Sequence, residues 1–197
     1  FPALLKSGND HIADFYELRA EADARVAGHD SHVLLVQPKD ALRYGYRLWA
    51  EKSSGLLLRA DVLGERSEVI ETSAFSDVSI GIRPQPDVVL HAMKKLDGLQ
   101  VLRPVLLPTN LEVEGWTLRQ SVPGFREVSC VRRAMVAATE AAADPAQVVQ
   151  VIFSDGLTHV SLFIEPCDSR RHAKPMLAAV GATQTLMLRR DDWWITV

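Results

Sequence analysis

The chain has 197 residues, of which 47% are hydrophobic and 24% are charged, and its formal net charge is −3. Its length suits one large domain or two modest ones, and its composition is that of a globular protein with a buried core. Nucleic-acid binding usually requires a basic face, and the net negative charge gives no indication of one, so we expect no nucleic-acid partner. No apolar run approaches the ~20 residues that a membrane span requires.

The amino-terminal end reads like the middle of a protein. Phe1 is followed by Pro2, and neither a methionine nor a charged-then-apolar leader stands there. We therefore expect this sequence to be a fragment of a longer protein.

Residues 14–80 carry a hydrophobic period of two, which is the pattern of strands with one buried and one solvated face. Short turn sequences, such as residues 28–31 and 53–55, separate these segments. Strands every ~12 residues joined by short turns predict an antiparallel meander. The predicted strands lie near residues 16–26, 32–37, 43–51, 56–63 and 68–80.

Residues 82–112 differ from the preceding segment because four prolines interrupt them. Between these prolines, residues 87–96 place apolar side chains at helical spacing, with Asp87 near the start and two lysines near the end, as the helix dipole favours. We interpret the segment as a linker that contains one short helix.

A second unit begins near residue 113. Its pattern predicts a small α+β domain with one helix against an antiparallel sheet. The Ser154-Asp155-Gly156 sequence is typical of a hairpin turn between two apolar strands, rather than of an acid beside a nucleophile. Strands are predicted near 116–122, 125–135, 148–153, 158–165, 183–188 and 193–197, a helix at 170–180 that ends at Gly181, and a loop or helical turn at 137–146.

The two cysteines are Cys130 and Cys167. They form no C-x-x-C pair and lie near no histidine cluster, so zinc and thioredoxin-like sites are excluded. A disulfide or two buried thiols remain open. We predict that the two residues lie close enough to pair, which requires Cα atoms within roughly 7 Å.

The sequence contains no recognisable catalytic or metal-binding arrangement. No G-x-S-x-G elbow or phosphate-binding glycine loop occurs, and the six histidines are scattered. His29 and His32 straddle a predicted turn, which favours solvated side chains over a metal pair. We therefore expect no enzyme activity, no cofactor and no metal site.

The third predicted strand is rich in aromatic residues. In an extended strand, Tyr44 and Tyr46 occupy one face, whereas Arg43, Arg47 and Trp49 occupy the other. Tryptophan and arginine are the residues that most often dominate binding energy at interfaces. The second face is therefore a predicted partner-binding surface. The alternative is a core face backed by a half-covered surface.

A set of apolar side chains is predicted to point inward from successive strands. These side chains predict an inner face on which an acyl chain would gain ~0.8 kcal/mol per buried methylene. A filled protein core is the alternative. The set consists of Leu34, Val36, Tyr46, Leu48, Leu56 and Leu58.

Several motifs match, in order and over nearly the whole chain, those of one protein family. Residues 43–49 (R-Y-G-Y-R-L-W) and 54–61 (S-G-L-L-L-R-A-D) closely resemble the R-Y-G-Y-R-L-W…T-G-L-L-L-R-S-D run of the MucB/RseB family of sigma-factor regulators. Residues 123–125 resemble its P-x-G-F or P-P-G-F turn. Residues 154–157 (S-D-G-L) and 160–165 resemble its S-D-G-L…V-S-V-F-V-E hairpin, and residues 181–183 and 195–197 also fit.

The resemblance implies a periplasmic protein with two domains. The first would be a half-open β-barrel like that of the lipoprotein carriers LolA and LolB, and the second a small α+β domain. We therefore expect part of the half-barrel at residues 1–81, a linker with a short helix at 82–112 and the second domain at 113–197. The first part of the barrel would precede Phe1, and the family's last helix would follow residue 197.

The resemblance also implies a function. Family members bind the periplasmic part of an anti-sigma factor, RseA or MucA, and shield it from the protease that begins the envelope-stress response. Lipopolysaccharide or mislocalised lipoprotein acyl chains release them. We expect this regulatory role, with a periplasmic lipid or lipoprotein carrier as the alternative, and we leave open whether the protein forms a homo-oligomer.

Overall fold

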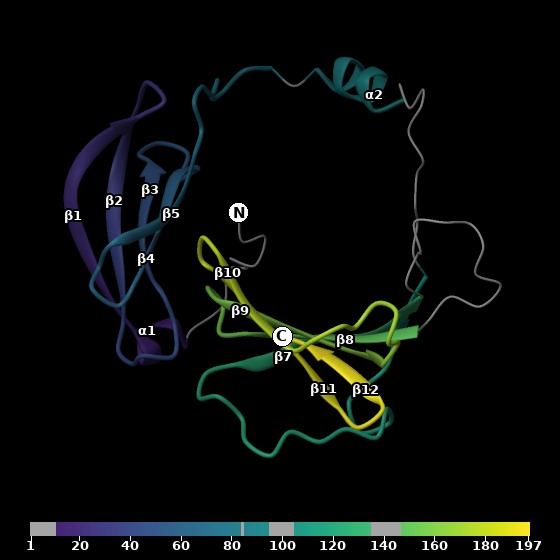
Figure 1. Cartoon of the computed structure of the whole chain (residues 1–197). Helices are drawn as coiled ribbons and strands as arrows, with labels where there is room; N and C mark the ends of the chain where they lie inside the picture. The colour runs from purple at the N-terminus through teal and green to yellow at the C-terminus, as the bar shows by residue number, and fades with distance from the viewer. Residues whose placement is uncertain (1–10, 84, 95–104, 135–146) are drawn as a thin grey trace.

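The computed structural model describes residues 11–83, 85–94, 105–134 and 147–197. These residues form two open antiparallel sheets, one of five strands and one of seven, together with two short helices. Figure 1 shows the two sheets beside each other and helix α2 (Pro86–Lys94) apart from both. The expected fold class, mainly antiparallel α+β with a half-open first sheet, is confirmed. Neither helix in the described part of the chain is long and apolar enough to cross a membrane.

The first sheet is the predicted meander, because its five strands pair in chain order. Helix α1 (Ile12–Phe15) leads directly into it. The last strand ends at Ala74 rather than at the predicted residue 80, because Ala74 pairs with Arg59 and the neighbouring strand begins only two residues before Arg59. The strands are β1 (Tyr16–Val26), β2 (His29–Pro38), β3 (Gly45–Glu51), β4 (Leu57–Leu63) and β5 (Val69–Ala74).

The second sheet has the order β10-β11-β12-β9-β8-β7-β6. Its main apolar cluster contains Leu111, Cys130, Val149, Val151 and Ile164, and Val151 is completely buried. The strands are β6 (Leu106–Pro108), β7 (Arg126–Ala134), β8 (Gln147–Ser154), β9 (His159–Pro166), β10 (Met176–Val180), β11 (Thr183–Arg190) and β12 (Trp193–Thr196).

Two sequence predictions in the second unit are wrong. The helix predicted at 170–180 is a turn followed by β10, because Pro175 interrupts a helix and Val180 pairs with Thr183 in a tight hairpin. The strand predicted at 116–122 has no partner strand, and Trp116 instead packs against the core cluster. Strand β6 lies within the segment predicted as linker and pairs with β7 at the sheet edge, where its terminal proline is tolerated.

The linker helix is confirmed as α2 over Pro86–Lys94. The end of the predicted helix at Leu96 and the Ala-rich segment 137–146 lie outside the described residues. Because β6 lies within the segment predicted as linker, part of that segment joins the second sheet. The division into domains at residues 81 and 113 stays a prediction.

The predicted approach of Cys130 and Cys167 is wrong, and both thiols are free. Cys130 on β7 pairs with Val151 on β8, and Val151 pairs with Leu162 on β9, so Cys130 lies two strands away from Leu162. Cys167 follows Leu162 by a further five residues along the chain. With strands about 4.8 Å apart and a rise of about 3.3 Å per residue, this separation far exceeds the roughly 7 Å between Cα atoms that a disulfide allows. Burial, together with nearby Glu127, raises the pKa of the Cys130 thiol.

The turn between β3 and β4 is built around the Glu51 carboxylate. One of its oxygens accepts hydrogen bonds from the Ser54 hydroxyl and backbone N–H, both at 2.6 Å. The Ser53 N–H donates to the other oxygen at 3.1 Å, and the Ser53 hydroxyl also contacts the carboxylate. Because all these donors favour the charged form, the pKa of Glu51 falls to about 2.

This turn gives a prediction about pH. We expect Ser54→Ala to raise the pKa of Glu51 toward its ordinary value of 4.5, because it removes the strongest of these donors. A carboxyl whose pKa is lowered by folding contributes its full stabilisation at any pH above its pKa in the unfolded state. That contribution is lost as the pH falls toward the folded-state pKa of about 2. The stability difference between wild type and variant should therefore be complete at neutral pH and disappear between about pH 4.5 and 2.

The measurement is an NMR titration of the Glu51 side-chain carbonyl, with urea unfolding at several pH values. Ser76→Ala, at an exposed position outside the strands, is the control and should leave the titration unchanged. A wild-type Glu51 that titrates near 4.5 would contradict the hydrogen-bonded turn.

Candidate functional site

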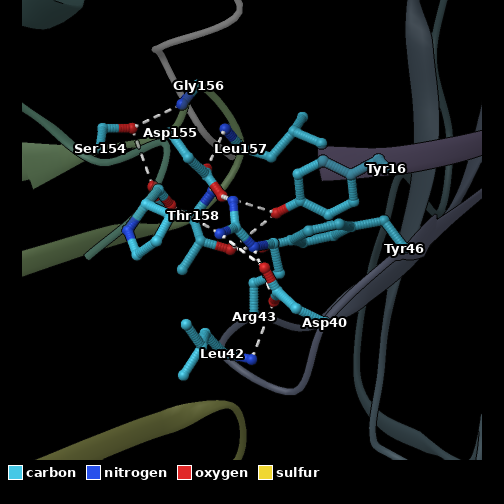
Figure 2. Close-up of polar contacts among 11 residues, drawn as sticks. Tyr16, Asp40, Leu42, Arg43, Tyr46, Ser154, Asp155, Gly156, Leu157 and Thr158 are labelled. Carbon is cyan, nitrogen blue, oxygen red and sulfur yellow. Dashed lines mark hydrogen bonds and ion pairs between the residues drawn. The ribbon is translucent and has the colours of Figure 1, made fainter. Parts of the chain in front are cut away.

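The two sheets meet at a cluster of polar groups around the buried side chain of Arg43, which we call the junction. Figure 2 shows the guanidinium of Arg43 at its centre, between the tyrosine rings of the first sheet and the turn that connects β8 to β9. The junction consists of Tyr16, Asp40, Arg43 and Tyr46 from the first unit and of Pro123, Asp155 and Thr158 from the second.

Arg43 uses its guanidinium donors on both units. Nη1 donates to Asp155 Oδ2 at 2.9 Å, and Nη2 donates to the Pro123 carbonyl oxygen at 2.8 Å. On its own side, Nε donates to Asp40 Oδ1 at 3.0 Å. The side chains of Arg43 and Asp155 are completely buried. A charge removed from water is costly unless it is paired, so the position of Arg43 constrains both units at once.

The electrostatics of the junction keep its charges in place. Burial alone would lower the pKa of Arg43, but the hydrogen bond and charge of Asp40 and the charge of Asp155 outweigh it and hold the pKa above its usual value. Burial would likewise raise the pKa of Asp40, but the bonds from Arg43 and the Leu42 N–H hold it below its usual value. The Arg43–Asp40 ion pair therefore persists near neutral pH.

Aromatic rings surround the guanidinium. Its carbon lies 4.6 Å from the ring centre of Phe15, 5.3 Å from that of Phe125 and 5.7 Å from that of Tyr16. These distances allow cation–π attraction, which is strongest where water is excluded. Gly124 lets Phe15 approach, because a Cβ atom there would lie 2.7 Å from the Phe15 ring.

Asp155 links the turn to the first sheet. Its Oδ1 accepts the Leu157 N–H at 3.0 Å and the Thr158 N–H at 2.7 Å, which shapes the turn. Its Oδ2 accepts the Tyr16 hydroxyl at 2.9 Å, in addition to Arg43. Burial and the nearby negative charge raise the pKa of Tyr16, so this tyrosine stays protonated and remains a donor.

A second contact across the junction joins Tyr46 to the turn. The Tyr46 hydroxyl lies 2.8 Å from the Thr158 hydroxyl. Leu157, which lies between Asp155 and Thr158 in the chain, packs in a buried cluster with Tyr16 and Val36. The turn is therefore attached to the first sheet by polar and apolar contacts together.

The junction is not apparent from the sequence patterns. The Ser-Asp-Gly pattern predicts only a hairpin turn for Asp155, which is confirmed, and gives no sign of its bond to Arg43, 112 residues away in the chain. Three of the motifs that carry the family resemblance nevertheless meet here: residue 43 of the R-Y-G-Y-R-L-W run, the turn at 123–125 and the S-D-G-L turn at 154–157. The presence of all three motifs in one chain was the only sign of the junction in the sequence, but a single sequence does not reveal which motifs are in contact.

The common exposed face expected for Arg43, Arg47 and Trp49 is wrong. Arg43 precedes β3 and is buried in the junction. Trp49 is only 8% exposed, with the Arg59 guanidinium stacked 4.4 Å from its ring centre. Arg47 is partly exposed and forms an ion pair with Glu21 at 2.8 Å. Partner binding by these three residues stays a prediction, although they do not share the exposed strand face from which it was made.

The residues expected to bind an acyl chain are mostly brought together. In register, Leu34 pairs with Leu48 and Val36 with Tyr46, so these four side chains share one face of the first sheet, which we call the inner face. Leu58 is completely buried at a bulge in β4. Leu56 lies before β4 and is 40% exposed, because the bulge shifts the register there. Lipid binding stays a prediction.

The two histidines nearest to each other in the sequence, His29 and His32, contact different partners. Contrary to the predicted turn, His29 and His32 both lie in β2, where His32 contacts Asp23 and His29 lies 3.1 Å from the Val78 carbonyl oxygen. Within the described ranges, no group of three or more His, Cys, Asp or Glu side chains could hold a metal ion.

Comparison with known proteins gives a consistent result. The MucB/RseB N-terminal domain matches residues 1–94, and the MucB/RseB C-terminal domain matches residues 110–197. The Sigma factor AlgU regulatory protein MucB of Pseudomonas aeruginosa is 30% identical over 181 residues, which cover 88% of this chain and 54% of that protein. The Sigma-E factor regulatory protein RseB of Escherichia coli K12 is 24% identical, over 82% of this chain and 48% of that protein.

Solved structures resemble the chain over both sheets. The structure of the Pseudomonas aeruginosa MucA/MucB complex has a TM-score of 0.70 and 26% identity, covering 98% of this chain and 62% of that chain. A crystal structure of MucB has a TM-score of 0.62 and 26% identity, covering 94% and 58%. The chain thus spans about half the length of the curated relatives it matches.

The junction predicts the effect of removing its central charge pair. We expect Asp155→Asn to lower the free energy of unfolding by about 3 kcal/mol, the lower end of the cost of breaking a buried ion pair, because Asp40 still neutralises Arg43. Asparagine keeps an oxygen for the N–H groups of the turn, so the loss reports the missing charge together with the lost acceptor for Arg43 and Tyr16. Urea unfolding measures it.

Asp61→Asn is the matched control, because Asp61 is also buried and ion-paired, with Arg59, but lies within the first sheet. Both variants should lose stability. A larger radius of gyration in small-angle X-ray scattering is expected for Asp155→Asn and not for Asp61→Asn. The same radius in both would mean that the junction does not hold the sheets together.

Proposed function

Because the chain belongs to the MucB/RseB family, we propose that it is part of a periplasmic negative regulator of an envelope-stress sigma factor. It binds the periplasmic part of an RseA/MucA-like anti-sigma factor and shields that segment from proteolysis. The observation that carries the proposal is the match of one family domain to each of the two sheets, in order.

The junction supports a binding role that uses both sheets. A partner segment that is unstructured when free loses conformational entropy on binding, so a surface that is already fixed favours its capture. The buried Arg43–Asp155 pair fixes the two sheets relative to each other. The likeness to MucB in a complex with MucA, which extends over 98% of this chain, also supports this arrangement.

The remaining parts of the proposal concern chemistry, location and release. The relatives are named as regulatory proteins, which supports binding rather than catalysis. The complex of a relative with MucA(peri) supports a periplasmic location. Acyl chains of lipopolysaccharide or lipoprotein would act as the release signal, and the apolar inner face of the first sheet is where such a chain would bind.

A lipid or lipoprotein carrier is the second candidate. The shared face of Leu34, Val36, Tyr46 and Leu48 favours it, because alternate apolar residues on neighbouring strands offer a continuous surface to an acyl chain. A carrier role leaves the second sheet and the junction without a purpose, so we rank it below the regulator.

The test uses the full-length protein that contains this chain. Isothermal titration with the periplasmic segment of the anti-sigma factor from the same genome should give a Kd of about 1 μM or tighter. Asp155→Asn should weaken binding about tenfold, because molecules with separated sheets must first reassemble the surface. In parallel, the bound segment should resist the protease that cleaves it when free.

Asp61→Asn serves again as the control and should bind within about twofold of wild type, since it leaves the junction intact. Absence of binding by a folded wild-type protein would refute the regulator and favour the carrier. Equal binding by Asp155→Asn would show that the partner does not need the junction.

A further inference from the structure

The turn between β8 and β9 places one apolar side chain of the second sheet directly on the first. Leu157 is 7% exposed and forms a buried cluster with Tyr16 and Val36. Leu34, Tyr46 and Leu48 pack against the same cluster. Leu157 therefore covers the part of the inner face where the acyl-chain residues gather.

Polar contacts hold this leucine in place from both sides. Asp155, two residues before it, accepts hydrogen bonds from Arg43 and Tyr16. Thr158, the next residue, contacts the Tyr46 hydroxyl at 2.8 Å. Figure 2 shows Leu157 beside the ring of Tyr16 and these polar contacts below it. Removal of Leu157 from the inner face must therefore disturb the junction.

The apolar surface continues beyond the region that Leu157 covers. Leu18 pairs with Val36 in register, lies on the same face and is 49% exposed. An acyl chain that follows this face from Leu18 toward Val36 and Tyr46 meets Leu157. The ligand and the turn would then require the same space.

We propose that the Ser154–Thr158 turn is an autoinhibitory plug, in which Leu157 occupies the acyl-chain position on the inner face and must withdraw before a ligand binds there. Because the plug and the Arg43–Asp155 pair belong to one turn, withdrawal also opens the junction. Ligand binding and docking of the sheets are thus coupled with a negative sign, and the coupling is reciprocal.

The biological role of this coupling rests on the proposed function. An acyl chain would loosen the arrangement of sheets that holds the anti-sigma factor, so the lipid signal would reach the partner through the plug. The coupling itself depends only on contacts within this chain, and it can be measured without the partner.

The test measures binding of the apolar dye N-phenyl-1-naphthylamine to the full-length protein by fluorescence. The apparent affinity of a site that is open in only a fraction of molecules is reduced by that fraction. We therefore expect Leu157→Ser to bind the dye about tenfold more tightly than wild type. Thr158→Val loses the hydroxyl that contacts Tyr46 and should give a smaller increase in dye affinity. This milder variant tests the proposal even if Leu157→Ser fails to fold.

Two controls locate the effect. Asp61→Asn removes a buried carboxylate charge on the opposite face of the first sheet from Tyr46 and should leave dye affinity unchanged. Val36→Asp places a charge on the inner face and should abolish dye binding, both alone and combined with Leu157→Ser. Myristate, a triacylated peptide and lipopolysaccharide are then compared as competitors of the dye, to identify the source of the acyl chain.

Hydrogen exchange gives an independent readout of the plug. Saturation with the preferred competitor should speed amide exchange at residues 154–158 in wild type, because the turn leaves the inner face. Exchange in the core strand β8 around Val151 should stay unchanged.

Equal or weaker dye binding by folded Leu157→Ser would overturn the plug, since Leu157 would then be neutral or part of the ligand site. Absence of dye binding in every variant, or an unchanged turn in the presence of ligand, would overturn it as well. None of these results affects anti-sigma factor binding by wild type, and failure of that binding leaves the dye measurements intact, so the two proposals fail separately.

Discussion

The arrangement of the two sheets depends on how the buried guanidinium of Arg43 is neutralised. Its side chain has no contact with water, so it requires counter-charges and acceptors at fixed positions. The first unit supplies Asp40, and the second supplies Asp155 and the Pro123 carbonyl. Because a buried charge without its partner is strongly unfavourable, the two sheets meet in the geometry that satisfies this one residue.

The turn that supplies Asp155 makes both polar and apolar contacts with the same surface of the first sheet. Its carboxylate orders the turn through the Leu157 and Thr158 N–H groups while it also accepts from Arg43 and Tyr16. The same short segment buries Leu157 against the inner face. Polar fixation and apolar covering are therefore not independent, and in the proposed plug a ligand that competes for the apolar surface also acts on the charge pair. This connects the half-open first sheet to the second sheet in a protein of the MucB/RseB family.

The errors of the sequence predictions have physical causes. The pattern of residues 43–49 predicts one continuous strand, but β3 begins at Gly45, so Arg43 leaves the strand face and enters the junction. Trp49 was expected at the surface because period two puts it opposite the inner face, yet both faces of this sheet carry buried residues, and Arg59 covers the indole. The segment of β10 has an apolar run that suits helix or strand, and only the pairing with β11 decides between them.

Local sequence patterns determined the meander of the first sheet, the hairpins at 53–55 and 154–157 and the linker helix, because period-two alternation and turn residues act over a few neighbouring positions. The inner face of Leu34, Val36, Tyr46 and Leu48 followed from the same alternation. Only the tertiary structure decided that Leu56 leaves this face, because a single bulge residue shifts the register of β4. It alone also decided that Arg43 meets Asp155 across 112 residues, since an ion pair leaves no periodic trace in the sequence and depends on which surfaces the folded sheets bring together.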